Sequence, residues 1–137
     1  MAFLIFENIT FEHGAWNEPR FGFIGNQADR FYDEDGTENS IKSQFSARNC
    51  DGLKIKNCVF ANLESTAIGL IDGVSNAIIS ENIIRDVSGG GIVVGTTKHD
   101  GLLDGYEPCK NIRISENVIR RTSQKYMSCP AITVFYE

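Results

Sequence analysis

The side chains best suited to proton transfer gather in one polar segment, Thr96 to Pro108. His99 and Asp100 are adjacent there, and a histidine beside a carboxylate can act as an acid–base or orienting pair near neutral pH. Tyr106 lies in the same segment, and Asp72, at the end of an apolar stretch, is a further catalytic candidate. The structural alternative is a solvated turn, because the segment also contains an Asp-Gly dipeptide of the ordinary turn type.

Two further residues are candidates for binding a ligand. Trp16 lies in segment 12–43, which carries several aromatic residues and is much longer than a usual connection. Arg48 ends an apolar stretch that precedes the one ending at Asp72. Each has a structural alternative, since Trp16 can simply pack the long segment and Arg48 can form an ion pair with Asp72.

The sequence predicts neither a metal site nor a cofactor. Asp33-Glu34-Asp35 is the only acidic triplet, and carboxylates are the ligands that calcium prefers. The ligand spacing of helical calcium loops is absent, so we expect solvated loop charge here. The four cysteines form no C-x-x-C pair, which argues against structural zinc.

Composition excludes several classes of protein. The chain has 137 residues, with 13 Lys and Arg against 18 Asp and Glu, a net charge of −5. Without a basic run, nothing would offset repulsion by phosphates, so we expect no nucleic-acid partner. No apolar stretch approaches the roughly 18 residues that cross a bilayer, so we expect no membrane partner. The hydrophobic content of 42% indicates a folded protein, of a size that suits one domain.

The elements that position the candidate residues follow an internal repeat. The stretch Ile78-Ile79-Ser80-Glu81-Asn82-Ile83-Ile84 reappears 35 residues later as Arg113-Ile114-Ser115-Glu116-Asn117-Val118-Ile119. An earlier unit, 54–60, precedes the first of these by 24 residues, and a still earlier copy fits 6–11. The chain therefore contains four units, with a long segment 12–43 in the first and an insertion 96–110 before the last.

Each complete unit contains three short apolar segments with a period of two, the pattern of strands with one buried face. In the second unit these segments are 53–55, 59–60 and 68–71. Segments this short, separated by Asp-Gly and Gly-Gly pairs, cannot be ordinary helices. Three strands per repeat predict an all-β, right-handed parallel β-helix of about four coils, in which each strand stacks on its counterpart.

An asparagine column supports the stacking. Asn82 and Asn117 occupy one position at a tight bend, with Cys58 in that position one unit earlier. We expect the two amides to hydrogen-bond between coils, and the asparagines to adopt the left-handed conformation of the bend. Cys50 and Cys109 share another column two coils apart, too far for a disulfide, so we expect mostly or wholly free thiols.

The repeat resembles the right-handed parallel β-helix proteins of the pectin-lyase-like superfamily. The resemblance is carried by NAIISENIIRDVSGGGIVVG and NIRISENVIRRTS…PAITV, and it covers roughly residues 44 to 137. ITFEHGAWNEPRFGF, followed by QA, is similar to a segment of some β-helix glycoside hydrolases. The resemblance implies an extracellular or periplasmic location and a substrate cleft on the third strand of each coil.

A polysaccharide or oligosaccharide is the partner that the resemblance implies. The expected catalytic residues are then Asp72, His99 and Asp100, and the expected substrate-binding residues are Trp16, Arg48 and Tyr106, with aromatic faces that suit pyranose rings. The outward side chains of the third strands include almost no carboxylate, whereas glycosidases usually use two. Two functions stay open: a carbohydrate-active enzyme, hydrolase before lyase, or a non-catalytic module for glycan binding or structural spacing.

The predicted stack lacks polar caps at either end, which solenoids usually need. We therefore expect a piece of a longer β-helix, or ends covered by partner chains, with homo-oligomers through the uncapped coils as one outcome.

Overall fold

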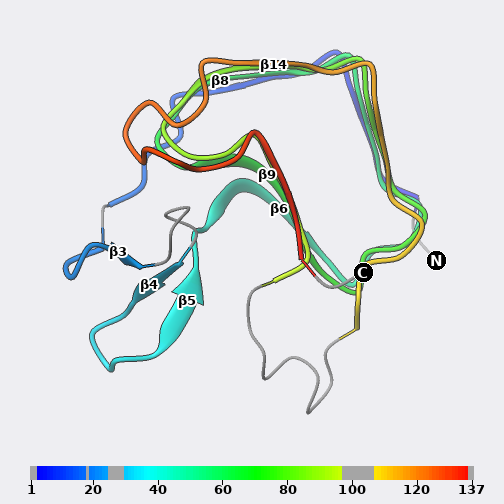
Figure 1. Ribbon diagram of the computed structural model, residues 1–137. Helices are drawn as coiled ribbons and strands as arrows, with labels where there is room; N and C mark the ends of the chain where they lie inside the picture. Colours follow the sequence, from blue (N-terminus) through cyan, green and yellow to red (C-terminus); the bar gives the residue numbers. More distant parts are fainter. Residues whose placement is uncertain (1–2, 18, 25–29, 97–106, 136–137) are drawn as a thin grey trace.

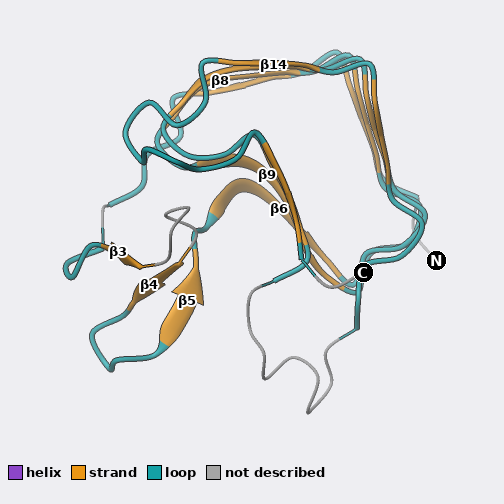
Figure 2. Cartoon of the chain, viewed as in Figure 1, coloured by secondary structure: helices purple, strands orange, loops and turns teal. Residues whose placement is uncertain are grey.

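The computed structural model describes residues 3–17, 19–24, 30–96 and 107–135, and it is all-β over those residues. Three four-stranded parallel sheets surround a common interior (Figures 1 and 2). The first sheet is β1 (Ile5–Glu7), β7 (Lys54–Lys56), β10 (Ile78–Ser80) and β13 (Arg113–Ser115). The second sheet is β2 (Thr10–Glu12), β8 (Val59–Leu63), β11 (Ile83–Val87) and β14 (Val118–Arg120). The third sheet is β6 (Ser43–Arg48), β9 (Thr66–Asp72), β12 (Ile92–Val94) and β15 (Ile132–Val134).

The chain visits the three sheets in turn, and each circuit, here called a coil, adds one strand to every sheet. Viewed along the stack, the four coils nearly superimpose (Figure 1). The register confirms the predicted repeat, because Ile55 pairs with Ile79 and Ile79 with Ile114, while Phe6 and Phe11 pair with Ile55 and Phe60. These stacked parallel strands are consistent with the expected β-helix.

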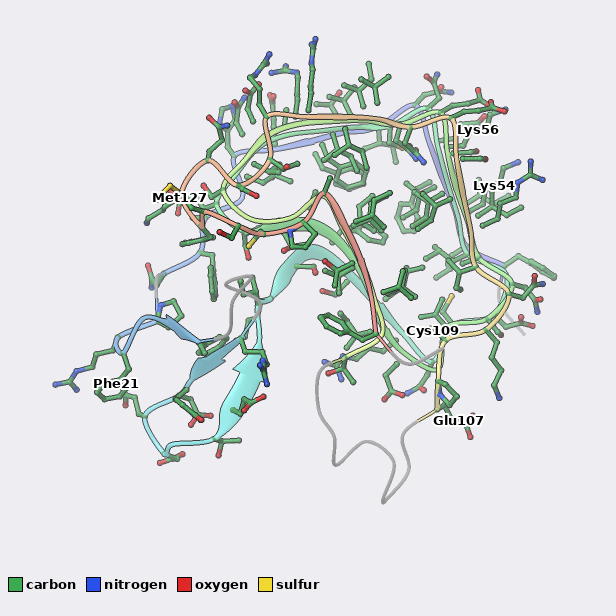
Figure 3. All side chains as sticks on the ribbon, in the orientation of Figure 1. Phe21, Lys54, Lys56, Glu107, Cys109 and Met127 are labelled. Carbon is green, nitrogen blue, oxygen red and sulfur yellow. The ribbon has the colours of Figure 1, made fainter. Side chains whose placement is uncertain are left out.

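The interior is filled by the apolar columns that the period of two predicts (Figure 3). Phe60, Ile68, Ile79, Ile84 and Ile92 are all fully buried. In the first coil the same columns hold Phe6, Phe11 and Phe45, whose rings pack edge to face with centroids 5.0–6.4 Å apart. Edge-to-face packing suits aromatic quadrupoles, so this coil has an aromatic core on which the aliphatic coils stack.

The asparagine column forms as expected at the bend between the first and second sheets. Asn82 is fully buried and donates its amide to the Ile55 carbonyl (3.0 Å) and to Asn117 Oδ1 (2.9 Å). Its own Oδ1 accepts from the Cys58 N–H at 2.9 Å. One side chain therefore satisfies backbone groups of the preceding coil, which explains a buried polar residue in this core.

The expected backbone conformation of these asparagines is wrong. Asn82 and Asn117 do not have positive φ; the residues before them do, Glu81 and Glu116 at 59° each. The glutamate, with its positive φ, makes the bend and keeps its side chain outside. The asparagine that follows turns its side-chain amide inward, where it hydrogen-bonds between coils. The tight bend requires this left-handed conformation in every coil, and the surrounding structure holds the glutamate in it despite the strain.

The segment 12–43, expected as a loop, contains a small antiparallel sheet of β3 (Phe23–Ile24), β4 (Arg30–Tyr32) and β5 (Glu38–Ser40), here called the insert sheet. It projects away from the coils beside the third sheet (Figure 1). The acidic triplet forms the turn between β4 and β5. Asp33 accepts from the Asp35 and Thr37 amides at 3.1 and 2.8 Å, so its carboxylate stabilises a hairpin turn.

None of the four cysteines forms a disulfide, in agreement with the thiols that the sequence predicts. The predicted column that joins Cys50 to Cys109 is present, because the neighbouring residues Asp51, Ser75 and Lys110 bridge in register. Over the described residues we find no helix long and apolar enough to cross a membrane.

Candidate functional site

The outer face of the third sheet is built from small side chains. Its central column, set by the strand register, runs Ser46, Gly69, Val93 and Thr133. Gly69 lies within β9, whose residues Thr66 to Ile71 are all buried. A Cβ at Gly69 would clash with the side chains of Ser43 and Ile71, so these two side chains cover the backbone in the middle of the face.

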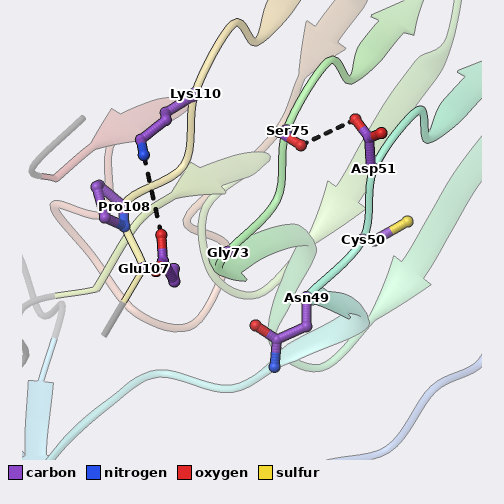
Figure 4. Close-up of a pocket in the computed structure, with 8 residues that line it drawn as sticks. All are labelled: Asn49, Cys50, Asp51, Gly73, Ser75, Glu107, Pro108 and Lys110. Carbon is purple, nitrogen blue, oxygen red and sulfur yellow. Dashed lines mark hydrogen bonds and ion pairs between the residues drawn. The ribbon is translucent and has the colours of Figure 1, made fainter. Parts of the chain in front are cut away.

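The face ends at a pocket of about 380 Å³, here called the turn pocket. It forms where the chain leaves the third sheet for the first, in three successive turns that lie side by side (Figure 4). The turns are joined by backbone hydrogen bonds, from Asn49 N–H to the Asp72 carbonyl (2.7 Å) and from Gly73 N–H to the Glu107 carbonyl (2.6 Å). The volume falls within the range of small-molecule sites.

Glycine suits the middle turn of the pocket, where the backbone is left-handed and the side chain of Asn49 lies close. Gly73 has a φ of 59°, and a Cβ there would lie 2.5 Å from Asn49 Oδ1. A larger residue would combine left-handed strain with a clash, and would displace the amide that faces the pocket.

The polar groups of the pocket form two sets, visible on either side of Figure 4. On one side Lys110 Nζ lies 3.8 Å from Glu107 Oε2, and both side chains are about two-thirds exposed. On the other side Ser75 Oγ donates to Asp51 Oδ1 at 2.9 Å. The pocket therefore offers carboxylates, an ammonium and an amide within one concave surface.

Asp51 is also part of a second polar ladder. Asn76 donates to Asp51 Oδ1 at 2.7 Å, and Asn111 donates to Asn76 Oδ1 at 2.6 Å. The hydrogen bond from Asn76, followed by that from Ser75, lowers the pKa of Asp51 below its ordinary 3.8, because both stabilise the carboxylate. Asp51 is therefore ionised at neutral pH and held in one orientation.

Of the predicted catalytic residues, Asp72 lies next to the turn pocket. Its Oδ1 accepts from the Glu107 N–H at 3.0 Å, which ties the end of β9 to the segment that follows the insertion. The expected ion pair with Arg48 does not form. The two residues are register partners, but the ladder is irregular between Ala47 and Arg48, and Arg48 extends into solvent.

Trp16 lies apart from the turn pocket, at the base of the insert sheet. Its ring packs edge to face against Phe31 (5.9 Å between centroids) and Tyr126 (5.7 Å), and its backbone N–H donates to Glu64 Oε2 at 3.1 Å. These contacts join the insert sheet to the second and fourth coils. They fit the packing alternative, and the half-buried indole keeps an exposed part for a ligand.

His99, Asp100 and Tyr106 lie outside the described residues, so their roles stay predictions. The pocket residues Asp51, Ser75 and Lys110 were missed as a site from the sequence. The signal was present, because offsets of 24 and 35 residues place these three in one column. Over the described part of the chain, no group of three or more His, Cys, Asp or Glu side chains is placed to hold a metal ion.

Comparison of the chain with family models, with curated proteins and with solved structures gave no match.

Proposed function

We propose that this chain is a right-handed parallel β-helix module that binds a polysaccharide or oligosaccharide along the outer face of the third sheet. The observation that carries the proposal is the turn pocket at the end of that face. Sugars present many hydroxyl groups, which bind to carboxylates, amides and ammonium groups held at fixed positions. The pocket offers all three kinds, in Asp51, Asn49 and Lys110.

The shape of the face also favours an extended ligand. Stacked strands repeat about every 4.8 Å, so a linear glycan lying across them would meet Ser46, Val93 and Thr133 at positions set by that spacing, with Ser43 and Ile71 covering Gly69 between them. The repeat motifs quoted above support kinship with the pectin-lyase-like proteins, and through it an extracellular or periplasmic location, where such glycans occur. The mixed charges of the pocket fit a neutral or cationic sugar better than a strongly acidic one.

Binding is favoured over turnover because the carboxylates of Asp51 and Asp72 already accept hydrogen bonds within the protein. Asp51 accepts from Ser75 and Asn76, and Asp72 accepts a backbone amide. Hydrolysis is the second candidate. It is favoured because Asp72 lies close to the segment that contains Glu107, at the end of the third-sheet face. Two carboxylates on one cleft are the minimum for a glycosidase, and His99 with Asp100 would add an acid–base pair.

The test is a glycan binding screen, followed by calorimetry on any glycan that binds. We expect Glu107→Gln and Lys110→Ala each to weaken binding about tenfold, the effect of losing a charge-assisted hydrogen bond. Glu116→Gln is the matched control, since this exposed glutamate lies in the bend between the first and second sheets. Loss of affinity in the control alone, or no binding to any neutral, acidic or amino glycan, contradicts the proposal.

Turnover is measured on the same glycans. New reducing ends would indicate a hydrolase, and unsaturated uronates a lyase. If Asp72→Asn or Asp100→Asn abolishes turnover while binding persists, the enzyme is the correct alternative. If a glycan binds with no product, and Trp16→Ala removes the binding, the non-catalytic module is supported.

A further inference from the structure

The turn pocket is lined by a carboxylate, Asp51, that neutral groups hold in place. Its Oδ1 accepts from Ser75 Oγ at 2.9 Å and from Asn76 Nδ2 at 2.7 Å. Among the described residues, no donor bonds its Oδ2 and no basic side chain forms an ion pair with it. A hydroxyl and an amide orient the carboxylate without cancelling its charge. One oxygen of a fixed, ionised group is therefore open to a further donor.

The cation of the pocket, Lys110, has a carboxylate of its own beside it. Its Nζ lies 3.8 Å from Glu107 Oε2, on the other side of the pocket from Asp51 (Figure 4). Both side chains are about two-thirds exposed, so the pair is loose and solvated, and Lys110 keeps donors for a sugar hydroxyl. The two charges balance, which leaves Asp51 as the charge of the lining without a counter-charge.

The charged residues that adjoin the lining in the sequence do not alter this balance. Arg48 precedes Asn49 on the first turn, and Asp72 precedes Gly73 on the middle turn. Their charges are opposite, so they add nothing in sum. In and beside the pocket, three described carboxylates (Asp51, Asp72 and Glu107) stand against two described cations (Arg48 and Lys110). The excess charge is negative, and a ligand with a positive group complements it.

We propose that the turn pocket selects a sugar unit with a free amino group, whose ammonium binds the Asp51 carboxylate. The inference rests on the proposed function and names its ligand class, an oligosaccharide with unsubstituted hexosamine units. An ammonium has three N–H donors and no acceptor, which suits a carboxylate with one open oxygen. An acetamido group in the same place lacks the charge, and a uronate would meet Asp51 as a like charge. The volume of about 380 Å³ lies near the lower end for small-molecule sites, so the pocket selects through one unit of the glycan.

The test compares two oligosaccharides that differ only at the amine, an oligomer of glucosamine and the same oligomer fully N-acetylated. Calorimetry is done in mildly acidic buffer, in which the amine carries its proton and Asp51, whose pKa is lowered, keeps its charge. We expect the free amine to bind about tenfold more tightly, the effect of one charge-assisted hydrogen bond. Asp51→Asn should remove most of this preference, because it deletes the charge and keeps an oxygen for Ser75 and Asn76. Added salt should weaken the amine more than its acetylated form.

Asp35→Asn is the matched control, since it removes the same charge from an exposed aspartate in the turn of the insert sheet and should leave the preference intact. Far-UV circular dichroism checks that each variant folds. Glu107→Gln gives a second measurement, because it leaves Lys110 unbalanced and should also lower the preference for the amine. Equal affinity for the two oligomers, or a preference that survives Asp51→Asn, overturns this inference while glycan binding stands. If no glycan binds at all, the proposed function fails with it.

Discussion

The inner coils and the last coil share one sequence pattern and one register, yet they differ in burial. Ile92 and Ile132 are direct partners in the third sheet, and the first is fully buried while the second is 43% exposed. The difference comes from neighbours alone, because a residue in a stacked coil is covered from both sides. In such a fold, burial is therefore a property of the position in the stack as much as of the residue.

The sharpest way to test this comparison is a pair of truncations in one column. Ile92→Ala should destabilise the chain by about 2–5 kcal/mol, the range for a fully buried isoleucine. Ile132→Ala should cost about 1 kcal/mol or less, because its side chain is already partly in solvent. Urea denaturation of both variants gives the two free energies of unfolding.

Equal losses in the two variants would contradict the comparison.

The asparagine ladder offers a second, smaller contrast. Asn82→Ala should cost about 3 kcal/mol, since it leaves the Cys58 N–H and the Ile55 carbonyl unpaired in the interior. Asn117→Ala removes a comparable set of bonds, including that to the Ile79 carbonyl, but water reaches the last coil. There we expect about 1 kcal/mol. Thermal melts of both variants check the order, and a larger loss in Asn117→Ala would refute it.

The smallest effect is the pH dependence of the contact between the third and fourth coils. Asp86 accepts from Arg121 of the fourth coil and from Arg85 beside it. These bonds, that of Arg121 first, lower the pKa of Asp86 well below its ordinary 3.8. At pH values above its pKa in the unfolded state, a carboxylate whose pKa is lowered by folding stabilises the folded state. This contribution is lost as the pH falls through the lower pKa that the carboxylate has in the folded state.

Melting temperatures measured from pH 7 down to pH 2 test this link. We expect part of the wild-type decline below about pH 3.8 to be absent in Asp86→Asn, and added salt to reduce the difference, because the pair is exposed. Asp33→Asn is a useful comparison, since its carboxylate accepts hydrogen bonds from the turn of the insert sheet. Identical acid profiles in wild type and Asp86→Asn would show that the exposed pair contributes nothing.

Much of the coil architecture could be predicted because the repeat consists of residue types with clear structural preferences. Ile55, Ile79 and Ile114 recur at the offsets that the register shows, and Asn82 and Asn117 align with them. The insert sheet, whose strands are two or three residues long, was missed. Coil strands equally short were found through the repeat, in which the insert strands have no counterpart. The pairing of the insert strands depends on the Asp33 turn and on the packing of Phe31 against Trp16.

The sequence singled out Asp72, which lies beside the turn pocket, and its catalytic role stays a prediction. Asp72 was identified as the end of a strand, and its position near the turn pocket agrees with that reasoning. The pocket was missed because Asp51, Ser75 and Lys110 come from three coils and none stands out alone. Arg48 shows the opposite error: alignment in a column suggested an ion pair with Asp72, and a local irregularity of the ladder prevents it.

By itself, the sequence determined which residues face the interior and how the coils align. That information is local, since a period of two and a repeat length follow from neighbouring residue types. Only the tertiary structure decided what the turns do. It showed that Glu81, and not Asn82, makes the bend, that the Asp72 carboxylate binds a backbone amide, and that three turns enclose a pocket. Such outcomes depend on groups far apart in the chain, whose distances are set when the coils stack.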